Sequence, residues 1–399
     1  MSEQKKVSAW VQIAALSVAL LSYTVSMMTP ALGEIAKAFP DAAPETIKLL
    51  VSIPSLMMVF FALISGKLTQ YMSIKKVITI AMILIFIGGI PSAFIGDLRF
   101  MIVMRVIFGA GYGMVFPMAS AVITDLFAGD QANKIMGFKS AVGAAAGVVF
   151  QMVGGMLAAY NWRYSFLGFL FVIPIALLIW FKLPDTGVKK VERINASGVK
   201  EKKLTTLTFV LTFVCALLNL VQFSFMTNLA MVVQADGIGN AAQSATVLTL
   251  FTASSFVVGM LYGNFSKVLK QYSASFGAFM VGVSFVILVF ANSMTLLIVG
   301  AIVFGIGFGA FNPAITMAIA KSAASPKFAA VAISVYVSGT GIGKFLSPYA
   351  LKFTRETLNL TSSRADWQIA AVALIVGSLI SIVLVALNSK KVEVVKQTV

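Results

Sequence analysis

The sequence predicts an all-α integral membrane protein with twelve transmembrane helices, arranged as two pseudo-symmetric six-helix bundles. Composition is the first reason: 59% of the 399 residues are hydrophobic and 11% are charged, whereas a soluble domain carries roughly 25% charged residues. The second is that apolar runs of the roughly 20 residues needed to cross a bilayer recur along the chain. The third is a motif that occurs twice, as GAGYGMVFP from Gly109 and GIGFGAFNP from Gly305.

Each apolar run is predicted to be a helix, because a backbone in lipid must satisfy its polar groups within the segment. The first run follows Lys5 and Lys6 like a signal peptide, but it continues to about Met28 without a clear cleavage site. We therefore interpret it as a spanning helix. The predicted helices cover approximately residues 9–30, 46–65, 75–95, 99–122, 137–158, 165–183, 205–231, 243–264, 275–291, 294–317, 328–350 and 367–388.

The distribution of basic residues predicts the orientation. Of the 30 Lys and Arg residues, 20 fall on one side of the predicted spans and seven on the other, with three inside the apolar runs. The positive-inside rule then predicts a multi-pass protein of the cell membrane with both termini in the cytoplasm. This bias also accounts for the net charge of +16, so we expect no binding to nucleic acid.

A hydrophilic stretch from Leu183 to Leu204, with six basic and three acidic residues, divides the helices six and six. It predicts an N-terminal six-helix bundle over residues 1–183, a cytoplasmic linker over 184–204 and a C-terminal six-helix bundle over 205–399. We find no sequence signal for an oligomer and expect a monomer in the lipid bilayer.

The repeated motif belongs to a longer register. A shift of 196 residues superimposes six positions, and this predicts a duplicated six-helix unit, a transporter design with the substrate site between the halves. The Gly-xxx-Gly faces among them are expected to bring helices close together. The pairs are Gly109 with Gly305, Gly111 with Gly307, Gly113 with Gly309, Pro117 with Pro313, Gly143 with Gly339, and Gly147 with Gly343.

Residues for chemistry other than transport are scarce. The single cysteine, Cys215, lies in an apolar run, and the chain has no histidine. The sequence shows no evident nucleotide-binding loop of the G-x-x-x-x-G-K-[ST] type, metal cluster or nucleophile–base pair. We therefore expect no enzyme activity, no metal and no cofactor.

The chain resembles the major facilitator superfamily of secondary transporters over its whole length. In that family the loop after the second helix reads roughly G-x-L-x-D-R-x-G-R-K. Here GKLTQYMSIKK keeps Gly66, Leu68 and Lys75, while Gln70 and Ser73 replace the aspartate and the glycine. The segment RVIFGAGYG, which begins at Arg105, matches the family's motif of an arginine followed by spaced glycines in helix 4.

Three further segments resemble the drug:proton antiporter branches. The family's helix 5 motif ends G-x-x-x-G-P-x-x-G-G, and GVVFQMVGG puts Gln151 and Met152 in place of the Gly-Pro. The segment GKFLSP, from Gly343 to Pro348, preserves more of that motif in helix 11, and NWRYSF matches the turn before helix 6. The resemblance implies rocker-type alternating access, and for the helix 4 arginine a part in proton coupling or substrate contact.

Three charged residues lie inside the apolar runs, where each costs roughly 2.5 kcal/mol or more. Arg105 and Lys344 break the symmetry of the repeat, since Ala301 and Val148 occupy the equivalent positions. Arg105 is a candidate for substrate binding or coupling, with capping of helix-end carbonyls as the alternative. Lys344 shares a face with Tyr336, Thr340 and Ser347, and its alternative is snorkelling to the outer headgroups. Lys139 is a third candidate, about one turn inside its boundary.

Uncharged polar residues complete the candidate substrate-binding set, although such residues often only bond neighbouring helices. Asn219 and Gln222 share a face of helix 7. The other candidates are Tyr23 in helix 1, Asn312 in helix 10 and Gln151 in helix 5.

Two transport functions remain open. One is secondary transport of small organic solutes, coupled to protons or to a counter-solute, with an anionic or amphipathic substrate in an electropositive central cavity. The alternative is a proton-coupled multidrug efflux antiporter. All 14 acidic residues lie at or beyond predicted helix ends, and Glu34 is the nearest candidate for a proton site. A non-transporting membrane sensor is a remote third possibility.

Overall fold

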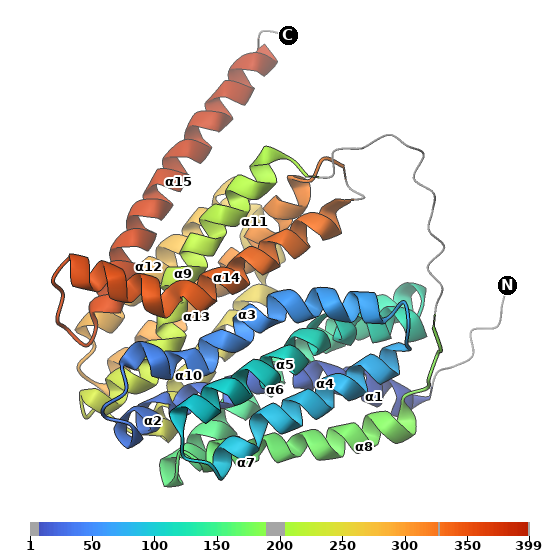
Figure 1. The fold of residues 1–399 in the computed structure, drawn as a ribbon. Coiled ribbons are helices and arrows are strands. Elements are labelled where there is room, and N and C mark those ends of the chain that lie inside the picture. Colours follow the sequence, from blue (N-terminus) through green and yellow to red (C-terminus); the bar gives the residue numbers. More distant parts are fainter. Residues whose placement is uncertain (1–7, 189–203, 326–327, 398–399) are drawn as a thin grey trace. The chain divides into compact units, whose positions relative to one another are not determined.

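The computed structural model describes residues 8–188, 204–325 and 328–397, nearly all of them helical (Figure 1). Most of the predicted linker, residues 189–203, lies outside the described residues, as do Lys5 and Lys6. The chain divides into two compact units. The first comprises residues 1–201 with 240–245, and the second comprises residues 202–239 with 246–399.

The first unit contains the first six predicted spans, three of which are interrupted by 3-10 turns. Its elements are α1 (Ala9–Leu21), η1 (Thr24–Met27), η2 (Thr29–Ala31), α2 (Leu32–Ala38), α3 (Pro44–Leu68), α4 (Ile74–Gly89), η3 (Pro91–Ala93), α5 (Leu98–Leu126), α6 (Gly129–Tyr160), α7 (Tyr164–Leu167), η4 (Gly168–Phe171) and α8 (Val172–Lys182).

The second unit contains the remaining six spans, except that the first five residues of α10 are grouped with the first unit. Its elements are α9 (Thr206–Ala235), α10 (Ala241–Met260), α11 (Tyr262–Leu269), η5 (Lys270–Tyr272), α12 (Ser273–Phe290), α13 (Met294–Lys321), α14 (Ala329–Thr357) and α15 (Ala365–Gln397).

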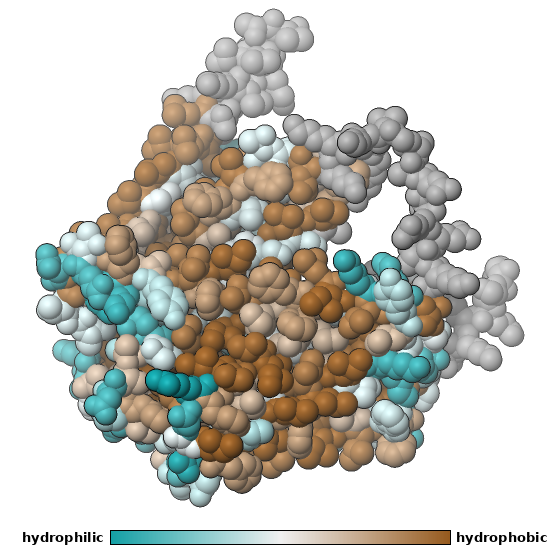
Figure 2. All heavy atoms as spheres, in the orientation of Figure 1, coloured by the Kyte–Doolittle hydropathy of each residue, from teal (hydrophilic) through white to brown (hydrophobic). Residues whose placement is uncertain are grey.

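The helices have the length and composition of membrane spans. Ten stretches in the described part of the chain are long and apolar enough to cross a bilayer, and the bent first span makes an eleventh. The twelfth, α14, has 29 residues but carries Thr340, Lys344 and Ser347 near its middle. Figure 2 shows hydrophobic side chains over the helices of the first unit, with hydrophilic side chains gathered at their ends.

The first span differs from the single helix predicted over residues 9–30. It breaks after Leu21, passes through η1 and η2, and continues as α2 to Ala38, with a bend of 51°. Pro30 has no N–H to continue the helical ladder, and Thr24 Oγ1 donates to the Leu21 carbonyl at 2.9 Å. The broken segment packs closely against two glycines. A Cβ at Gly154 would clash with the Met27 carbonyl oxygen, and a Cβ at Gly168 would clash with Met27 Sδ.

The repeated glycines make equivalent close helix contacts in the two units. In the first unit, a Cβ on Gly109 would lie 2.8 Å from Pro54 Cα on α3, and one on Gly111 would lie 2.5 Å from the Ala81 carbonyl oxygen on α4. Each glycine therefore brings α5 against the backbone of a neighbouring helix.

In the second unit, a Cβ on Gly305 would lie 2.6 Å from the Phe251 carbonyl oxygen on α10. A Cβ on Gly307 would lie 2.7 Å from the Gly277 carbonyl oxygen on α12. The pairs α3/α10, α4/α12 and α5/α13 thus occupy corresponding places in the two copies.

An aromatic core fills the second unit beside these contacts. Phe225, Phe251, Phe285 and Phe304 are at most 5% exposed. The rings of Phe225 and Phe304 stack with centroids 4.6 Å apart, and Phe251 meets both rings edge-on. This core joins α9, α10, α12 and α13 and so fixes the helices that carry Asn219, Gln222 and Asn312.

Candidate functional site

Arg105 is fully buried inside the first unit. Its guanidinium carbon lies 4.4 Å from the ring centroid of Phe108, one turn further along α5. It also lies 5.3 Å from the ring of Phe166 and 5.1 Å from that of Phe169. Aromatic faces attract a cation, so these three rings stabilise the guanidinium charge in the way that a carboxylate partner would.

One hydrogen bond orients the Arg105 guanidinium: Nη2 donates to the Gly88 carbonyl oxygen at 2.8 Å. Gly88 lies in the last turn of α4, where carbonyls lack intrahelical donors. Nε and Nη1 are buried and have no hydrogen-bond partner in the described part of the chain. The geometry is that of a helix-end cap, and a role for Arg105 in transport stays a prediction.

Lys344 lies within a residue of the midpoint of α14. The predicted helix ended near residue 350, but α14 continues to Thr357, so thirteen residues, about 20 Å, follow Lys344. The side chain is half-buried, and it makes no hydrogen bond or ion pair with any described residue.

The surroundings of Lys344 along α14 are polar. Pro348 lies inside the helix and has no N–H, so the Lys344 carbonyl oxygen, four residues earlier, receives no hydrogen bond from it. Tyr336 and Thr340 precede Lys344 by eight and four residues on the same face, and both are buried. The Thr340 hydroxyl donates to the Val337 carbonyl oxygen at 2.9 Å.

The glycines of α14 bring it close to α9. A Cβ at Gly339 would lie 2.6 Å from Thr212 Cγ2, and one at Gly343 would clash with the Ala216 carbonyl oxygen. One turn further, the Ser347 hydroxyl donates to the Leu220 carbonyl oxygen at 2.5 Å. The two helices therefore run side by side in a fixed register, and Pro348 is buried there.

Two amides on α9 differ in their hydrogen bonding. Asn219 is buried, and its Nδ2 donates to the Cys215 carbonyl oxygen at 3.0 Å. Gln222 is also buried, yet neither Nε2 nor Oε1 has a hydrogen-bond partner among the described residues. An unsatisfied buried amide is costly, so Gln222 is the stronger candidate for contact with a bound solute.

The first unit has its own polar positions. Lys139 lies ten residues after the start of α6, further inside the helix than the single turn predicted, and its Nζ donates to Ser120 Oγ on α5 at 2.5 Å. The Tyr23 ring covers Gly143 of α6 so closely that a Cβ there would clash with it. Gln151 and Gly147, on the same helix, are buried.

Asn312 on α13 makes only local contacts. Its Nδ2 donates to the Phe308 carbonyl oxygen at 3.3 Å, and the backbone carbonyl oxygen of Asn312 accepts from Thr316 Oγ1 at 2.8 Å. The side chain is half-buried, so it remains a candidate without a distinguishing contact.

Lys75, from the motif after the second span, caps a helix of its own unit. Its Nζ donates to the carbonyl oxygens of Trp180 and Leu183, both at 2.7 Å, at the C-terminus of α8. Gly66 and Leu68 lie in the last turn of α3, and a Cβ at Gly66 would meet no atom within 4 Å. Lys75 therefore links the start of α4 to the end of α8.

A buried carboxylate in the second unit was missed. Asp366, in the first turn of α15, is 2% exposed. It accepts from Asn228 Nδ2 at 2.8 Å and from Arg355 Nη1 at 3.1 Å. The sequence places Asp366 just before the predicted helix over residues 367–388, and this position agrees with its place in the first turn of α15 but does not reveal its burial. An arginine eleven residues earlier was the available signal for a partner.

Two further acidic residues, Glu45 and Glu34, lie in the first turns of their helices. Glu45, in the first turn of α3, is buried, as is Lys48 one turn later. Glu34 lies in the first turn of α2, which continues the first span to Ala38, and it is half-buried. Across the described ranges, no group of three or more acidic or cysteine side chains is arranged to hold a metal ion.

Comparison with known proteins gives consistent matches. The family model described as Major Facilitator Superfamily matches residues 14–348. The quinolone resistance protein NorA of Staphylococcus aureus is 27% identical over 318 residues, which cover 75% of this chain and 78% of NorA. The multidrug transporter protein MdtP of Bacillus subtilis is 32% identical over 107 residues, only 26% of this chain and 19% of MdtP.

Among solved structures, the nucleoside transporter NupG has the same fold. The match has a TM-score of 0.76 and covers 93% of this chain and 97% of NupG, at 14% sequence identity.

Proposed function

Because this chain belongs to the major facilitator superfamily, we propose that it moves small organic solutes across the cytoplasmic membrane by alternating access, with anionic or amphipathic solutes as substrates. Members of this family are transporters that bind small molecules and are often coupled to protons. The helices of this chain support a multi-pass membrane protein. We place both termini in the cytoplasm, from the positive-inside bias. We also propose that the protein is a monomer, that it needs no cofactor and that it has no enzyme activity.

Lys344 carries this proposal. A lysine at the centre of a membrane helix costs about 2.5 to 3.5 kcal/mol when nothing compensates its charge, and no described residue pairs with it. An anionic group of a solute would supply the missing partner through a charge-assisted hydrogen bond. Separately, the unpartnered Gln222 amide on α9 supports contact with a polar group of a solute.

Coupling to protons or to a counter-solute follows from the same chemistry. An anion that neutralises Lys344 can be replaced by another anion, and this exchange leaves the lysine paired in both directions of the cycle. A proton travelling with the anion would serve equally well. The energy source is a solute or proton gradient in either case.

A second candidate, proton-coupled multidrug efflux, is favoured by the similarity to NorA and MdtP. These relatives are named a quinolone resistance protein and a multidrug transporter protein, and the segment NWRYSF resembles the drug:proton antiporter branches. An exporter of lipophilic cations would need a carboxylate that exchanges a proton for the drug. Glu34 is the nearest such group in the first span, and it is half-buried.

A binding screen with purified protein in detergent separates the two candidates. The panel holds small organic anions, amphipathic anions, neutral drugs and lipophilic cations. A ligand of the folded state raises the apparent melting temperature by mass action. The variants are Lys344→Ala and, as a matched control on the same helix, Lys352→Ala, whose side chain is 42% exposed and pairs with Glu356 at 3.8 Å.

We expect anions to stabilise the wild type and Lys352→Ala, and to bind Lys344→Ala at least ten times more weakly. Stabilisation by cations or neutral drugs, unchanged in Lys344→Ala, would contradict the anion proposal. That result would favour efflux, and Glu34→Gln in a proton-coupled assay in liposomes would be the next variant.

A further inference from the structure

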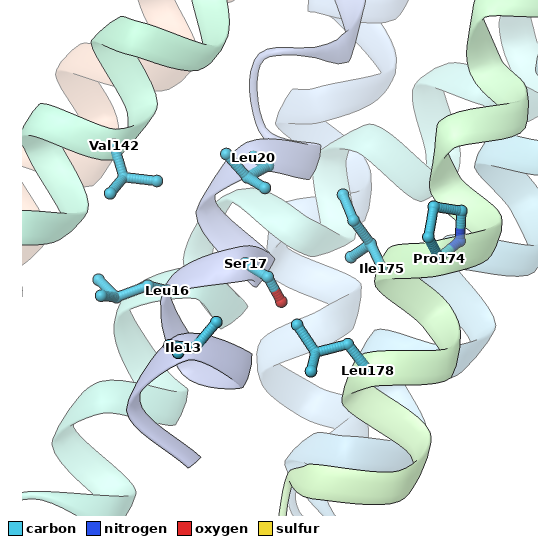
Figure 3. A pocket seen from close by; sticks show the side chains of 8 residues that line it. All are labelled: Ile13, Leu16, Ser17, Leu20, Val142, Pro174, Ile175 and Leu178. Atoms are coloured by element: carbon cyan, nitrogen blue, oxygen red, sulfur yellow. The ribbon is translucent and has the colours of Figure 1, made fainter. Parts of the chain in front are cut away.

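An apolar groove of about 410 Å³ runs along the first unit between α1, α6 and α8 (Figure 3). Its lining is hydrocarbon apart from Ser17, whose hydroxyl donates to the Ala14 carbonyl oxygen at 2.8 Å and is therefore satisfied. The residues that line it are Ile13, Leu16, Ser17, Leu20, Val142, Pro174, Ile175 and Leu178.

The groove lies on a side of the unit that exposes large apolar side chains. Beside it on α8, Leu177 is 53% exposed and Phe181 is 74% exposed, while Ile13 on α1 is 48% exposed. These exposures are those of side chains that face lipid in a membrane protein. The groove offers no free polar group to orient a polar solute, which substrate sites require, so a hydrocarbon chain is the occupant that its chemistry fits.

The dimensions fit one leaflet. From Ile13 to Leu20 the groove follows α1 for about 10 Å, by helix rise. Half of a hydrocarbon core of about 30 Å is about 15 Å. An acyl chain that spans one leaflet is therefore long enough to fill the whole length of the groove.

A lysine and a tryptophan close one end. Trp10 precedes Ile13 by three residues on α1, and Lys182 follows Leu178 by four residues on α8, so each continues a lining face. Lys182 Nζ lies 5.8 Å from the centroid of the Trp10 ring. Lys182 is exposed and makes no hydrogen bond or ion pair with any described residue. In contrast, Lys75, 6.0 Å from the Trp180 ring, already bonds two carbonyls.

We propose that this groove binds one acyl chain of an anionic phospholipid, with the lipid phosphate held by Lys182 beside Trp10. Tryptophan and lysine at the level of the headgroups are the usual anchors of a membrane interface. The predicted orientation puts this end of α1 and α8 in the cytoplasmic leaflet, where anionic lipids attract lysines near the surface.

Native mass spectrometry of the delipidated full chain tests the proposal. The protein is titrated with dioleoyl phosphatidylglycerol or dioleoyl phosphatidylcholine, and the lipid that remains bound is counted. We expect one phosphatidylglycerol to bind at least fivefold more tightly than phosphatidylcholine. Lys182→Gln should remove most of this preference, since one surface lysine is worth about fivefold.

Matched variants test charge and groove separately. Lys67→Gln removes an exposed lysine from the last turn of α3, on the same predicted side of the membrane, and should leave the preference intact. Val142→Phe fills the groove and should weaken both lipids, as should Ile13→Trp, whose exposed position tolerates a larger side chain. Ile173→Phe, 42% exposed on α8 and outside the lining, should change neither.

Equal binding of the two lipids by the wild type would overturn the proposal. So would equal losses in Lys67→Gln and Lys182→Gln, because the lysine would then contribute only general surface charge. Unchanged phosphatidylglycerol binding in both groove-filling variants would show that the headgroup binds without the groove.

Discussion

Arg105 Nη2 donates to the carbonyl oxygen of Gly88 at 2.8 Å, which ties α5 to the C-terminal turn of α4. Both residues lie where the two helices touch, because a Cβ on Gly88 would clash with the Phe108 backbone nitrogen. The guanidinium therefore sits at a helix contact, enclosed by aromatic rings, with two of its nitrogens unpartnered.

We predict that Arg105→Lys lowers the apparent melting temperature more than Arg105→Met does. An ammonium is more strongly hydrated than a guanidinium, so Lys would keep a buried charge at a higher desolvation cost. Met gives up the Gly88 hydrogen bond, worth about 1.5 to 3 kcal/mol for a charged donor, but also removes the buried charge. Thermal unfolding of both variants in one detergent is the measurement. A Lys variant that melts above the Met variant would show that the charge at Arg105 stabilises the fold.

Gly109→Ala and Gly305→Ala should destabilise the protein by similar amounts, about 1 to 3 kcal/mol each. The added methyl group would meet Pro54 in the first unit and Phe251 in the second, so α5 and α13 would each have to move off a neighbouring helix. Gly137→Ala on α6 is the control, because a Cβ there meets no atom within 4 Å and alanine favours a helix. A large loss in only one of the glycine variants would mean that the two copies are not packed alike.

Gln222→Leu should raise the melting temperature of the solute-free protein while weakening solute binding. The substitution removes a buried amide without partners, whose cost is on the order of 1 to 3 kcal/mol. Asn219→Leu is the matched control on the same helix, since that amide already bonds the Cys215 carbonyl. It should give no such rise. A fall in melting temperature with Gln222→Leu, measured without ligand, would indicate that the amide is satisfied in the free protein.

Asp366→Asn should cost about 3 kcal/mol, because breaking a buried ion pair leaves its partner poorly compensated. Asp366 is buried, and Arg355 is 24% exposed in its side chain. Glu356→Gln breaks the exposed pair with Lys352, one turn further along α14, and should change stability by less than about 1 kcal/mol. Comparable shifts in the melting temperatures of the two variants would mean that burial does not set the strength of the Asp366 pair.

The fold class and the positions of the spans could be predicted from the sequence, because apolar length alone marks a membrane helix. The residues at which the helices begin and end could not be predicted in the same way. Hydropathy records the part of a helix that lies in lipid, whereas α6 begins at Gly129 and α14 continues to Thr357 through charged residues. This difference moved Lys139 and Lys344 further inside their helices than predicted. The break in the first span was also missed, although Pro30 was visible, because its position depends on glycines of other helices.

The candidate site was only partly accessible to sequence reasoning. A charge in an apolar run is conspicuous, so Arg105 and Lys344 stood out. The direction in which each side chain points is decided by packing, and helices with apolar residues on every face give no periodic signal for it. Arg105 therefore could not be assigned to a helix contact in advance. Asp366 was overlooked because its burial depends on Asn228 and Arg355, which are distant in sequence or in a different helix.

The depth of Lys344 determines how transport would respond to membrane voltage. Moving one elementary charge across 100 mV is worth about 2.3 kcal/mol. A monovalent anion that pairs with Lys344 near the middle of α14 would have crossed roughly half of the membrane voltage. Carrying such an anion alone into a cell that is negative inside is opposed by the voltage. Swapping one monovalent anion for another moves no net charge. Transport of an anion alone and exchange of one anion for another would therefore differ in one measurement. With equal solute concentrations on both sides of a liposome, a potassium diffusion potential should change the rate of solute uptake only when the anion moves alone.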